Sequence, residues 1–577
     1  MTALALAQKK AEHWRTFDLD IDTRNEIDRL EKEDEKQFID SFYSDLEFGT
    51  GGLRGVMGVG SMRMNRYTVG MATQGLANYI NRSTDQGSVA IAYDSRNLAS
   101  FFASIAADVL SANGIRVFLF NELRPTPLLS FAVRELGCTS GIVITASHNP
   151  KEYNGYKVYW NDGGQILPPH DAGIIQEVRG VAHWNEVKKD RNETLVEVVP
   201  SHVEEKYLRL VSELNLSSSE VQQVSDLGIV YTSIHGSGIT LVPKTLAAYG
   251  FKNVKLVQEQ SIPDGNFPTV ESPNPEERSA MKMALDLASK EDASLVLGTD
   301  PDTDRVGIGV RNNKNELVLL NGNQAGSLLV YYRLKRSLEL GILPSNAYVA
   351  KTIVTSDLID RIAKSFQVPC YETLTGFKFI AGLIGKKEGS EVFIAGGEES
   401  YGYLVGEFVR DKDAALSSVQ FAEIAAYAKA NGTSIWNMLL DLYKEHGCFQ
   451  EELVSITLKG IEGIQQIKKM MNTLRTTPPQ SLGGVQVAEI SDYLVQRNVI
   501  LKNMKERVIE LPKSDVLQFI LEDGSKISVR PSGTEPKIKF YFSLRDELLS
   551  KEVYNEVALL LNDKIHRIKE ELLQLAE

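Results

Sequence analysis

Short apolar runs alternate with longer amphipathic stretches through most of this 577-residue chain. The runs are of strand length and are bounded by Gly, Asp or Ser, whereas the stretches between them carry apolar residues at helical spacing. This alternation is typical of α/β units built around mainly parallel sheets. The pattern therefore predicts an α/β protein.

The alternation occurs three times, which predicts three similar α/β units. In each unit the last apolar run leads directly into a polar loop, the position where functional loops lie in open α/β sheets. We expect strands of the first unit within residues 88–96, 116–120 and 140–150, of the second within 227–238, 253–257 and 293–305, and of the third within 346–356, 368–376 and 390–400.

The two ends of the chain have other patterns. Residues 1 to about 45 place Glu, Lys, Asp and Leu at helical spacing, and the glycine-rich FGTGGLRG follows at 48–55. Near the C-terminus, two strands flank an Asp-Gly turn, and a charged amphipathic helix follows from about residue 549. We therefore expect a helical preface and a closing α+β domain.

Length supports several domains, because single hydrophobic cores stop growing beyond roughly 250–300 residues. The changes of pattern predict an N-terminal preface with an α/β domain, two further α/β domains, all with mainly parallel mixed sheets, and a C-terminal α+β domain. Their expected bounds are 1–210, 211–322, 323–448 and 449–577.

Composition narrows the class of protein. The chain has 63 Lys+Arg against 76 Asp+Glu, and this net charge of -13 repels nucleic acid and anionic membranes. The cysteines Cys138, Cys370 and Cys448 lie too far apart to suggest a disulfide framework or a zinc site. We find no signal peptide core and no apolar segment near the roughly 20 residues that span a bilayer. These features favour a soluble cytoplasmic protein.

The loop GTDPDTDRVG carries Asp300, Asp302 and Asp304 at alternate positions. In an extended backbone alternate side chains face the same way, so the three carboxylates are expected to converge. Such crowding is unfavourable without a cation, and oxygen ligands beside a phosphate favour Mg²⁺. Arg305 follows where a calcium-binding helix-loop-helix would need glycine. The alternative is an acidic surface turn.

Three further loops contain candidate binding groups. TASHNP places Ser147 and His148 at the end of a strand, although adjacent strand residues point to opposite faces, so His148 is not automatically the base for Ser147. GGEESYG offers Glu398, Glu399 and Ser400 to sugar hydroxyls, or else caps a helix. RPSGTEPK suits a phosphate dianion through its cations, hydroxyls and unhindered backbone, carried by Arg530, Ser532, Gly533, Thr534 and Lys537.

Together these four loops resemble those of the α-D-phosphohexomutases, in that family's order. TASHNP, GTDPDTDR, GEESYG and RPSGTEP look like the phosphoserine, metal, sugar and phosphate loops of the family. The resemblance implies four domains around a central active-site cleft. It also implies an isomerase that moves a phosphoryl group between two hydroxyls of a sugar.

The resemblance further implies roles for individual residues. Ser147 would carry the phosphoryl group and complete a Mg²⁺ site with Asp300, Asp302 and Asp304. Glu398 and Ser400 would hold sugar hydroxyls, and Arg530, Ser532, Gly533, Thr534 and Lys537 would grip the nonreacting phosphate. The basic positions that match the family near its active site are Arg54, Arg96, Lys157, Lys378 and Lys412. Arg305, beside the metal ligands, could contact a phosphate or the nucleophilic serine.

The sugar loop indicates which sugar phosphate is the substrate. GEES followed by an aromatic residue and Gly402 resembles glucose-preferring members, whereas dual-specificity members often carry a histidine at that place. The resemblance thus implies interconversion of glucose 1-phosphate and glucose 6-phosphate through a glucose 1,6-bisphosphate intermediate, which would also act as activator. Mannose and pentose phosphates remain alternatives, and the chain would be a monomer or a homodimer.

Phosphoryl transfer also needs a group that removes the proton of the attacking hydroxyl. Lys157 and Lys412 are the candidates, with a pKa that we expect burial and positive neighbours to lower. Two rival functions remain. An aspartyl-phosphate phosphatase would use Asp300 or Asp302 but leaves TASHNP unexplained, and a noncatalytic phosphosugar-binding protein would not need Ser147 together with the three aspartates.

Overall fold

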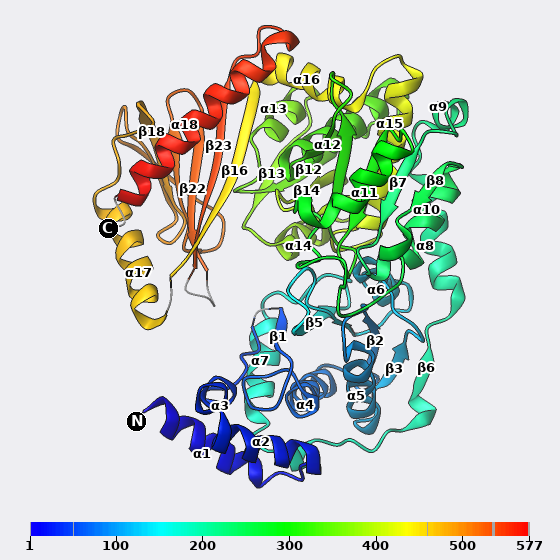
Figure 1. Ribbon diagram of the computed structural model, residues 1–577, viewed down its shortest axis with the longest axis vertical. Helices are drawn as coiled ribbons and strands as arrows, with labels where there is room; N and C mark the ends of the chain where they lie inside the picture. Colours follow the sequence, from blue (N-terminus) through cyan, green and yellow to red (C-terminus); the bar gives the residue numbers. More distant parts are fainter. Residues whose placement is uncertain (1, 50, 459, 533–536, 575–577) are drawn as a thin grey trace. The chain divides into compact units, whose positions relative to one another are not determined.

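The computed structural model describes residues 2–49, 51–458, 460–532 and 537–574 (Figure 1). The chain divides into two compact units. The first comprises Met1–Gly322 with Phe377–Gly432, and the second comprises Asn323–Gly376 with Thr433–Glu577. The predicted α/β fold class is confirmed, because each expected apolar run contains a strand in the structure.

The helical preface consists of α1 (Ala3–Arg15), α2 (Ile21–Glu33) and α3 (Glu35–Phe42). Each helix begins where a side-chain oxygen of Thr2, Asp20 or Asp34 accepts a hydrogen bond from a backbone N–H of the first turn. Trp14 of α1 packs edge-on against the Tyr67 ring, with 5.6 Å between ring centroids. Tyr67 and Val109 of the first α/β domain thus belong to the hydrophobic core of the preface.

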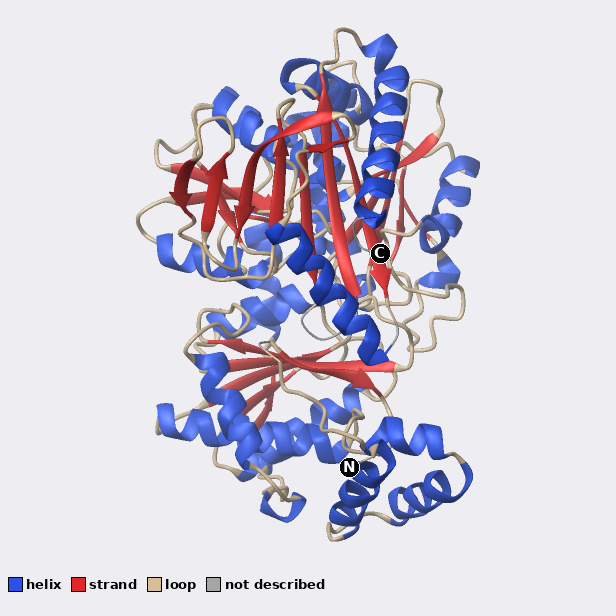
Figure 2. Ribbon diagram, turned by 90° about the vertical axis from the view of Figure 1, so that its left-hand side faces the viewer, coloured by secondary structure: helices blue, strands red, loops and turns tan. Residues whose placement is uncertain are grey.

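The first sheet has the strand order β1-β5-β4-β2-β3-β6. Figure 2 shows its strands in red with helices in blue beside them. Strand β2 is parallel to both β3 and β4, whereas β5 runs antiparallel to β4 and to β1. Helices α5 and α6 pack against β2, so this strand is buried and almost wholly apolar. The elements are β1 (Gly52–Val56), α4 (Arg66–Ser83), β2 (Ser88–Tyr93), α5 (Ala99–Ala112), β3 (Arg116–Leu119), α6 (Thr126–Glu135), β4 (Ser140–Ile144), β5 (Tyr153–Trp160), α7 (His170–Gly180) and β6 (Val196–Val198).

The second sheet has the order β11-β10-β9-β7-β8. Strands β8 and β9 are parallel to the central β7, and β10 reverses direction to pair with β9. This reversal makes the aspartate-rich loop the link between an antiparallel pair. The elements are α8 (Ser201–Glu213), α9 (Ser218–Gln223), β7 (Ile229–Thr232), α10 (Val242–Tyr249), β8 (Val254–Leu256), α11 (Arg278–Lys290), β9 (Leu295–Thr299), β10 (Val306–Arg311) and β11 (Leu317–Leu320).

The third α/β segment contributes elements to both compact units. The first unit holds α14 (Phe377–Lys387), the antiparallel pair β14 (Val392–Gly397) and β15 (Tyr403–Val405), and α15 (Ala414–Ala430). The second unit holds α12 (Gly322–Glu339), the parallel pair β12 (Ala347–Thr352) and β13 (Cys370–Thr373), α13 (Leu358–Ser365) and α16 (Ile435–His446).

The predicted α+β ending is confirmed as an antiparallel sheet with α17 and α18. Its strand order is β16-β23-β22-β21-β18-β19-β20, and β21 and β22 are the two strands predicted around the Asp-Gly turn. Figure 1 shows α18 lying across β16 and β23. The elements are β16 (Cys448–Thr457), α17 (Gly460–Thr476), β17 (Ser481–Leu482), β18 (Val485–Asp492), β19 (Arg497–Ile500), β20 (Lys505–Val508), β21 (Leu517–Leu521), β22 (Lys526–Pro531), β23 (Lys537–Asp546) and α18 (Tyr554–Gln574).

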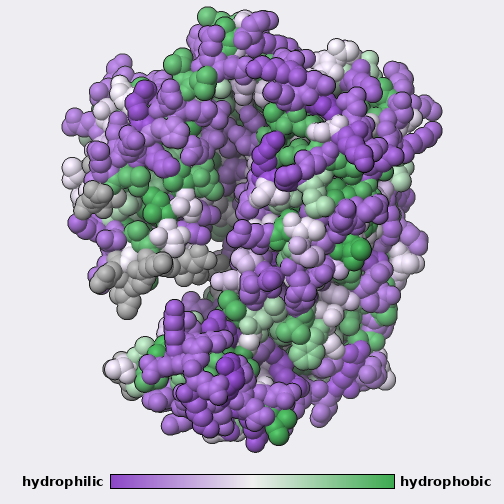
Figure 3. Space-filling model, viewed as in Figure 1, coloured by the Kyte–Doolittle hydropathy of each residue, from purple (hydrophilic) through white to green (hydrophobic). Residues whose placement is uncertain are grey.

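Most residues on the face of the molecule in Figure 3 are hydrophilic, and hydrophobic ones are interspersed among them. No helix in the described parts of the chain is long and apolar enough to cross a membrane.

Candidate active site

Ser147 lies in the loop that follows β4 and has a strained backbone conformation. Its φ of 52° lies in the left-handed region, which is uncommon for a residue with a Cβ and concentrates at functional sites. The side chain is nearly buried at 4% exposure, and its Oγ donates to Asp300 Oδ2 at 2.7 Å. Because Ser147 has left the strand conformation, Oγ also lies 3.2 Å from Nδ1 of the adjacent His148. The serine thus faces the aspartate loop.

The three aspartates of that loop converge as predicted, but for a different reason. Their carboxylate oxygens lie within 4.8 Å of one another, and all three side chains are buried. The segment is a turn with Thr303 at a φ of 60°, and not an extended strand. The turn therefore brings the carboxylates together, where we had expected strand alternation to do so.

The aspartate loop fits a cation. Asp302 Oδ1 and Asp304 Oδ1 are buried, and no described residue donates a hydrogen bond to either atom. Leaving such acceptors unsatisfied is unfavourable, and a cation coordinated between them would remove that penalty. Burial and the neighbouring carboxylates raise the pKa of Asp300 well above its ordinary value. This donor set of oxygens is suited to a hard divalent metal.

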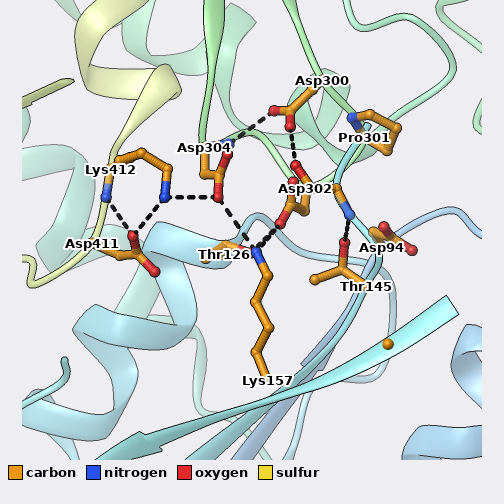
Figure 4. A network of polar contacts seen from close by, with 12 residues as sticks. Asp94, Thr126, Thr145, Lys157, Asp300, Pro301, Asp302, Asp304, Asp411 and Lys412 are labelled. Atoms are coloured by element: carbon orange, nitrogen blue, oxygen red, sulfur yellow. Dashed lines mark hydrogen bonds and ion pairs between the residues drawn. The ribbon is translucent and has the colours of Figure 1, made fainter. Parts of the chain in front are cut away.

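Two lysines reach the same carboxylates (Figure 4). Lys157 Nζ from β5 lies 2.8 Å from Asp302 Oδ2 and 3.4 Å from Asp304 Oδ2. Lys412 Nζ lies 3.2 Å from Asp304 Oδ2 and 3.1 Å from Asp411 Oδ1. Burial lowers the pKa of each lysine, but these carboxylates outweigh burial and raise it. The expectation of a lowered lysine pKa was therefore wrong for this arrangement.

Asp411 is a buried residue of the site that the sequence did not reveal. Tyr159 donates its hydroxyl to Asp411 Oδ2 at 2.6 Å, and Gln165 Nε2 donates to the same atom at 3.0 Å. The other oxygen, Oδ1, accepts from Lys412. Because Tyr159 and Gln165 lie far from RDKD in the sequence, only the fold identifies Asp411 as the group that orients Lys412.

Thr126 is a second residue that sequence reasoning missed. Its Oγ1 donates to Asp302 Oδ2 at 3.0 Å, and its backbone N–H donates to the carbonyl of Asp302 at 2.9 Å. Thr126 begins α6 of the first α/β domain, whereas Asp302 belongs to the second. This contact helps to bring the aspartate loop to the Ser147 side of the site.

The charged neighbours of the serine are held by ion pairs. Arg305 Nη1 lies 2.6 Å from Glu276 Oε1, and its Nε lies 3.8 Å from Asp304 Oδ1. Burial, followed by the charge of Arg305, lowers the pKa of His148 well below its ordinary value. Arg54 on β1 donates to Asn149 Oδ1 at 3.4 Å, beside the serine loop. These predicted basic residues thus surround one loop.

The predicted sugar loop belongs to the same compact unit as the serine and the aspartates. Glu398 and Ser400 lie between β14 and β15, where the Glu398 N–H donates to the Gly402 carbonyl at 2.9 Å. Lys378 lies in the first turn of α14, and burial lowers its pKa. Lys412 passes beside Gly402, where an added Cβ would lie only 2.0 Å from Lys412 Cδ.

The predicted phosphate loop belongs to the second compact unit. Arg530 is on β22, Lys537 begins β23, and the Ser532 N–H donates to the Lys537 carbonyl at 2.7 Å. Gly533 and Thr534 lie outside the described residues. The described ends of the loop belong to β22 and β23, which pair in antiparallel fashion up to Pro531 and Ile538.

A buried serine on a strained turn, next to an aspartate loop suited to a cation, is the equipment of a metal-assisted phosphoryl-transfer enzyme with a serine nucleophile. Models of the phosphoglucomutase/phosphomannomutase family match the chain along most of its length. They are alpha/beta/alpha domain I at residues 45–183, domain II at 205–313, domain III at 321–446 and the C-terminal domain at 482–560. The chain therefore belongs to this family and has its four domains.

Curated relatives and solved structures agree with this membership. The chain is 38% identical to the phosphoglucomutase of Staphylococcus haemolyticus (strain JCSC1435), in an alignment that covers 89% of this chain and 94% of the relative. It is also 38% identical to the phosphoglucomutase of Staphylococcus aureus (strain MRSA252), in an alignment that covers 88% of this chain and 91% of the relative.

Two solved structures share the fold. The exocytosis-sensitive phosphoprotein parafusin (phosphoglucomutase) from Paramecium, in its open form, has a TM-score of 0.67 at 18% identity, covering 92% of this chain and 96% of that one. A phosphoglucomutase/phosphomannomutase family protein from Burkholderia thailandensis has a TM-score of 0.62 at 17% identity, covering 92% and 98%.

Proposed function

We propose that this chain is a phosphoglucomutase that interconverts glucose 1-phosphate and glucose 6-phosphate through phosphorylated Ser147. The observation that carries the proposal is the 2.7 Å contact between Ser147 Oγ and Asp300 Oδ2, at a loop with two unsatisfied carboxylate oxygens. Relatives that bear the name phosphoglucomutase and are 38% identical over most of the chain support the choice of sugar.

We assign the metal site to Mg²⁺, held by Asp300, Asp302 and Asp304. Their oxygen-only donor set suits a hard cation, and Ser147 Oγ already contacts one of them. When bound, Mg²⁺ supplies Lewis-acid stabilisation of charge on the oxygen that leaves phosphorus. Lys157 and Lys412 neutralise the same carboxylates, so metal binding would require their contacts to rearrange.

The proposed reaction exchanges one P–O bond for another. A sugar hydroxyl attacks the phosphorus on Ser147, the bond from phosphorus to Oγ breaks, and the hydroxyl proton passes to a neighbouring base. Lys157, Lys412 and His148 are the candidates for that base. The resulting glucose 1,6-bisphosphate reorients within the site and transfers its other phosphoryl group to Ser147, which completes the cycle.

The remaining predicted residues would bind the sugar phosphate. Glu398 and Ser400 offer acceptors to its hydroxyls, and Arg54, Arg305 and Lys378 offer donors to the phosphate near Ser147. We assign the nonreacting phosphate to the loop of Arg530, Ser532, Gly533, Thr534 and Lys537. We retain 1–210, 211–322, 323–448 and 449–577 as domain bounds, and a monomer or homodimer as the assembly.

The test follows glucose 1-phosphate by phosphorus NMR with the purified protein, Mg²⁺ and a trace of glucose 1,6-bisphosphate. We expect glucose 6-phosphate to form, and to form faster with the bisphosphate than without it. Chelation of Mg²⁺ should stop its formation. Accumulation of inorganic phosphate would show that the protein is a phosphatase and not a mutase. Turnover confined to mannose or pentose phosphates would correct the substrate.

The matched variants are Ser147→Ala and Ser272→Ala. Loss of the nucleophile should lower kcat at least about 10³-fold. Ser272 is nearby, since its Oγ lies 3.5 Å from the His148 carbonyl, but it has no nucleophilic role in the proposal. Ser272→Ala should therefore retain activity. Equal activity of Ser147→Ala and the unmodified protein would contradict the phosphoserine mechanism.

A further inference from the structure

Arg96 holds the loop that carries Ser147. It lies just after β2 and is only 3% exposed. Its Nη2 donates to the Ser147 carbonyl at 2.6 Å and also to the Asn149 carbonyl. Its Nη1 donates to the carbonyls of Pro150 at 2.9 Å and Tyr153 at 3.0 Å. One guanidinium thus closes the whole connection from β4 to β5.

These contacts occupy the hydrogen-bonding capacity of both terminal nitrogens, each of which has two N–H groups. The remaining Nε is buried 3.6 Å from Asp94 Oδ2, and no described residue accepts a hydrogen bond from it. Arg96 therefore has no terminal N–H left for a phosphate. Apart from its positive charge, which a lysine at this position would keep, this residue acts on the reaction through the loop.

Arg96 is also fixed from the side of the second α/β domain. The Phe267 ring stacks on its guanidinium, with 5.1 Å from the Cζ atom to the ring centroid. The next residue, Asn97, donates from Nδ2 to Asn266 Oδ1 at 2.9 Å. Close approach at this point requires Gly265, because an added Cβ would lie 2.2 Å from the Asn97 nitrogen. The turn after β2 thus contacts both the serine loop and the domain of the aspartate loop.

We propose that Arg96 is a positioning residue that fixes Ser147 Oγ against the aspartate loop by anchoring four carbonyls of the serine loop. Ser147 has a strained φ of 52°, which persists only where surrounding contacts enforce it. Lysine cannot replace the planar guanidinium, because its ammonium offers three donors from a single atom. This inference rests on the proposed mutase function of the same site.

The experiment compares Arg96→Lys with the unmodified protein in the mutase assay. A misplacement of about 1 Å can lower a rate about 10²-fold, so we expect kcat per phosphorylated Ser147 to fall by about that factor. Because Arg96 does not touch the substrate, KM should change less than about threefold. Phosphoserine hydrolysis per mutase turnover, measured by mass spectrometry and phosphorus NMR, should rise.

Arg311 offers a matched control on the second sheet. Its guanidinium likewise donates to backbone carbonyls, those of Ala293 at 2.9 Å, Asn315 at 3.0 Å and Ala288 at 3.3 Å. We expect Arg311→Lys to lower the melting temperature without changing kcat per phosphorylated serine. A purely structural role for Arg96 predicts that the two variants behave alike.

Unchanged kcat in Arg96→Lys, or a decrease that matches only the unfolded fraction, would overturn the inference while the active unmodified protein upholds the mutase. Inactivity of the unmodified protein would instead refute the proposed function. If Arg96→Lys does not fold, Phe267→Leu decides, because it removes only the stacked ring. We expect a smaller fall in kcat with KM retained, and an unchanged kcat would count against Arg96.

Discussion

At the residue scale, the site depends on side chains that limit the positions of one another. Lys412 reaches both Asp304 and Asp411 only because residue 402 has no side chain. Asp411 is itself held by Tyr159 and Gln165, so its carboxylate cannot turn away from the lysine. Gly402 thus leaves just enough room for the Lys412 side chain, and Asp411 holds its ammonium group.

This confinement predicts the effect of Gly402→Ala. The new methyl group would lie 2.0 Å from Lys412 Cδ, so the lysine must move. If Lys412 moves the proton, kcat should fall about 10- to 100-fold, and Lys412→Ala alone should lower kcat about 10²- to 10⁴-fold. Steady-state kinetics with glucose 1-phosphate measures both effects.

The double variant separates this mechanism from a general disturbance of the sugar loop. With alanine at position 412 the clash is absent, so adding Gly402→Ala should cost no further activity. Additive losses in the double variant would show that Gly402 acts independently of Lys412. Such a result would remove Gly402 from the set of positioning residues.

At the element scale, two helices begin with aspartates in similar contacts but different burial. Asp413 caps α15, accepting from the Leu416 N–H, and Tyr207 donates to its Oδ2 at 2.7 Å. Asp20 caps α2, and Tyr67 donates to its Oδ2 at the same distance of 2.7 Å. Complete burial raises the pKa of Asp413 to about 6, whereas the hydrogen bonds of the part-exposed Asp20 outweigh burial and lower its pKa.

The two caps should therefore respond to pH with opposite sign. A raised pKa means that the folded state binds the proton more tightly, so Asp413 loses stabilisation as pH rises from about 4 to about 6. The full loss corresponds to about 3 kcal/mol. Asparagine stays neutral and still caps a helix. Relative to the unmodified protein, Asp413→Asn should thus gain melting temperature as pH rises through this range.

Asp20→Asn provides the comparison. Its lowered pKa makes the charged carboxylate stabilising, and this contribution develops as pH rises through the folded pKa and is complete just above the unfolded value of about 4. This variant should therefore lose melting temperature relative to the unmodified protein between about pH 3 and about pH 5, and the difference should stay constant at higher pH. Melting curves of both variants between about pH 3 and about pH 7, at constant ionic strength, test the pair. Parallel shifts of the two variants would contradict the assignment of these pKa directions.

The sequence predicted elements better than their contacts. Apolar runs placed the strands, because a strand buried on both faces needs a continuous run of apolar residues. Asp300, Asp302 and Asp304 were also predictable, since three neighbouring carboxylates need a cation. By contrast, Asp411, Thr126 and Arg96 act through partners far away in the chain, and the direction of the lysine pKa depends on carboxylates that only the fold brings close.

At the scale of the whole molecule, the proposed cycle divides its work between the two compact units. Ser147, the aspartates and the lysines belong to the first unit, whereas Arg530, Ser532 and Lys537 belong to the second. Each half-reaction uses the same serine, but the sugar must present either of its two ends. The phosphate that is not reacting therefore needs a binding group that works equally for both orientations, and the Arg530 loop is our candidate.

Arg530→Ala tests this division of work. Losing one charge-assisted hydrogen bond to phosphate should raise KM about 10- to 100-fold. It should also raise inorganic phosphate released per mutase turnover, because a loosely held sugar competes less well with water for the phosphoserine. Arg545→Ala is the control, since Arg545 lies near the end of β23 in the same sheet and its Nε donates to the Asp523 carbonyl at 2.5 Å. If Arg530→Ala kept the unmodified KM and released no additional inorganic phosphate, phosphate recognition would have to be assigned to another loop. The expected rise in both KM and hydrolysis would instead assign substrate retention to the second unit and the chemical step to the first.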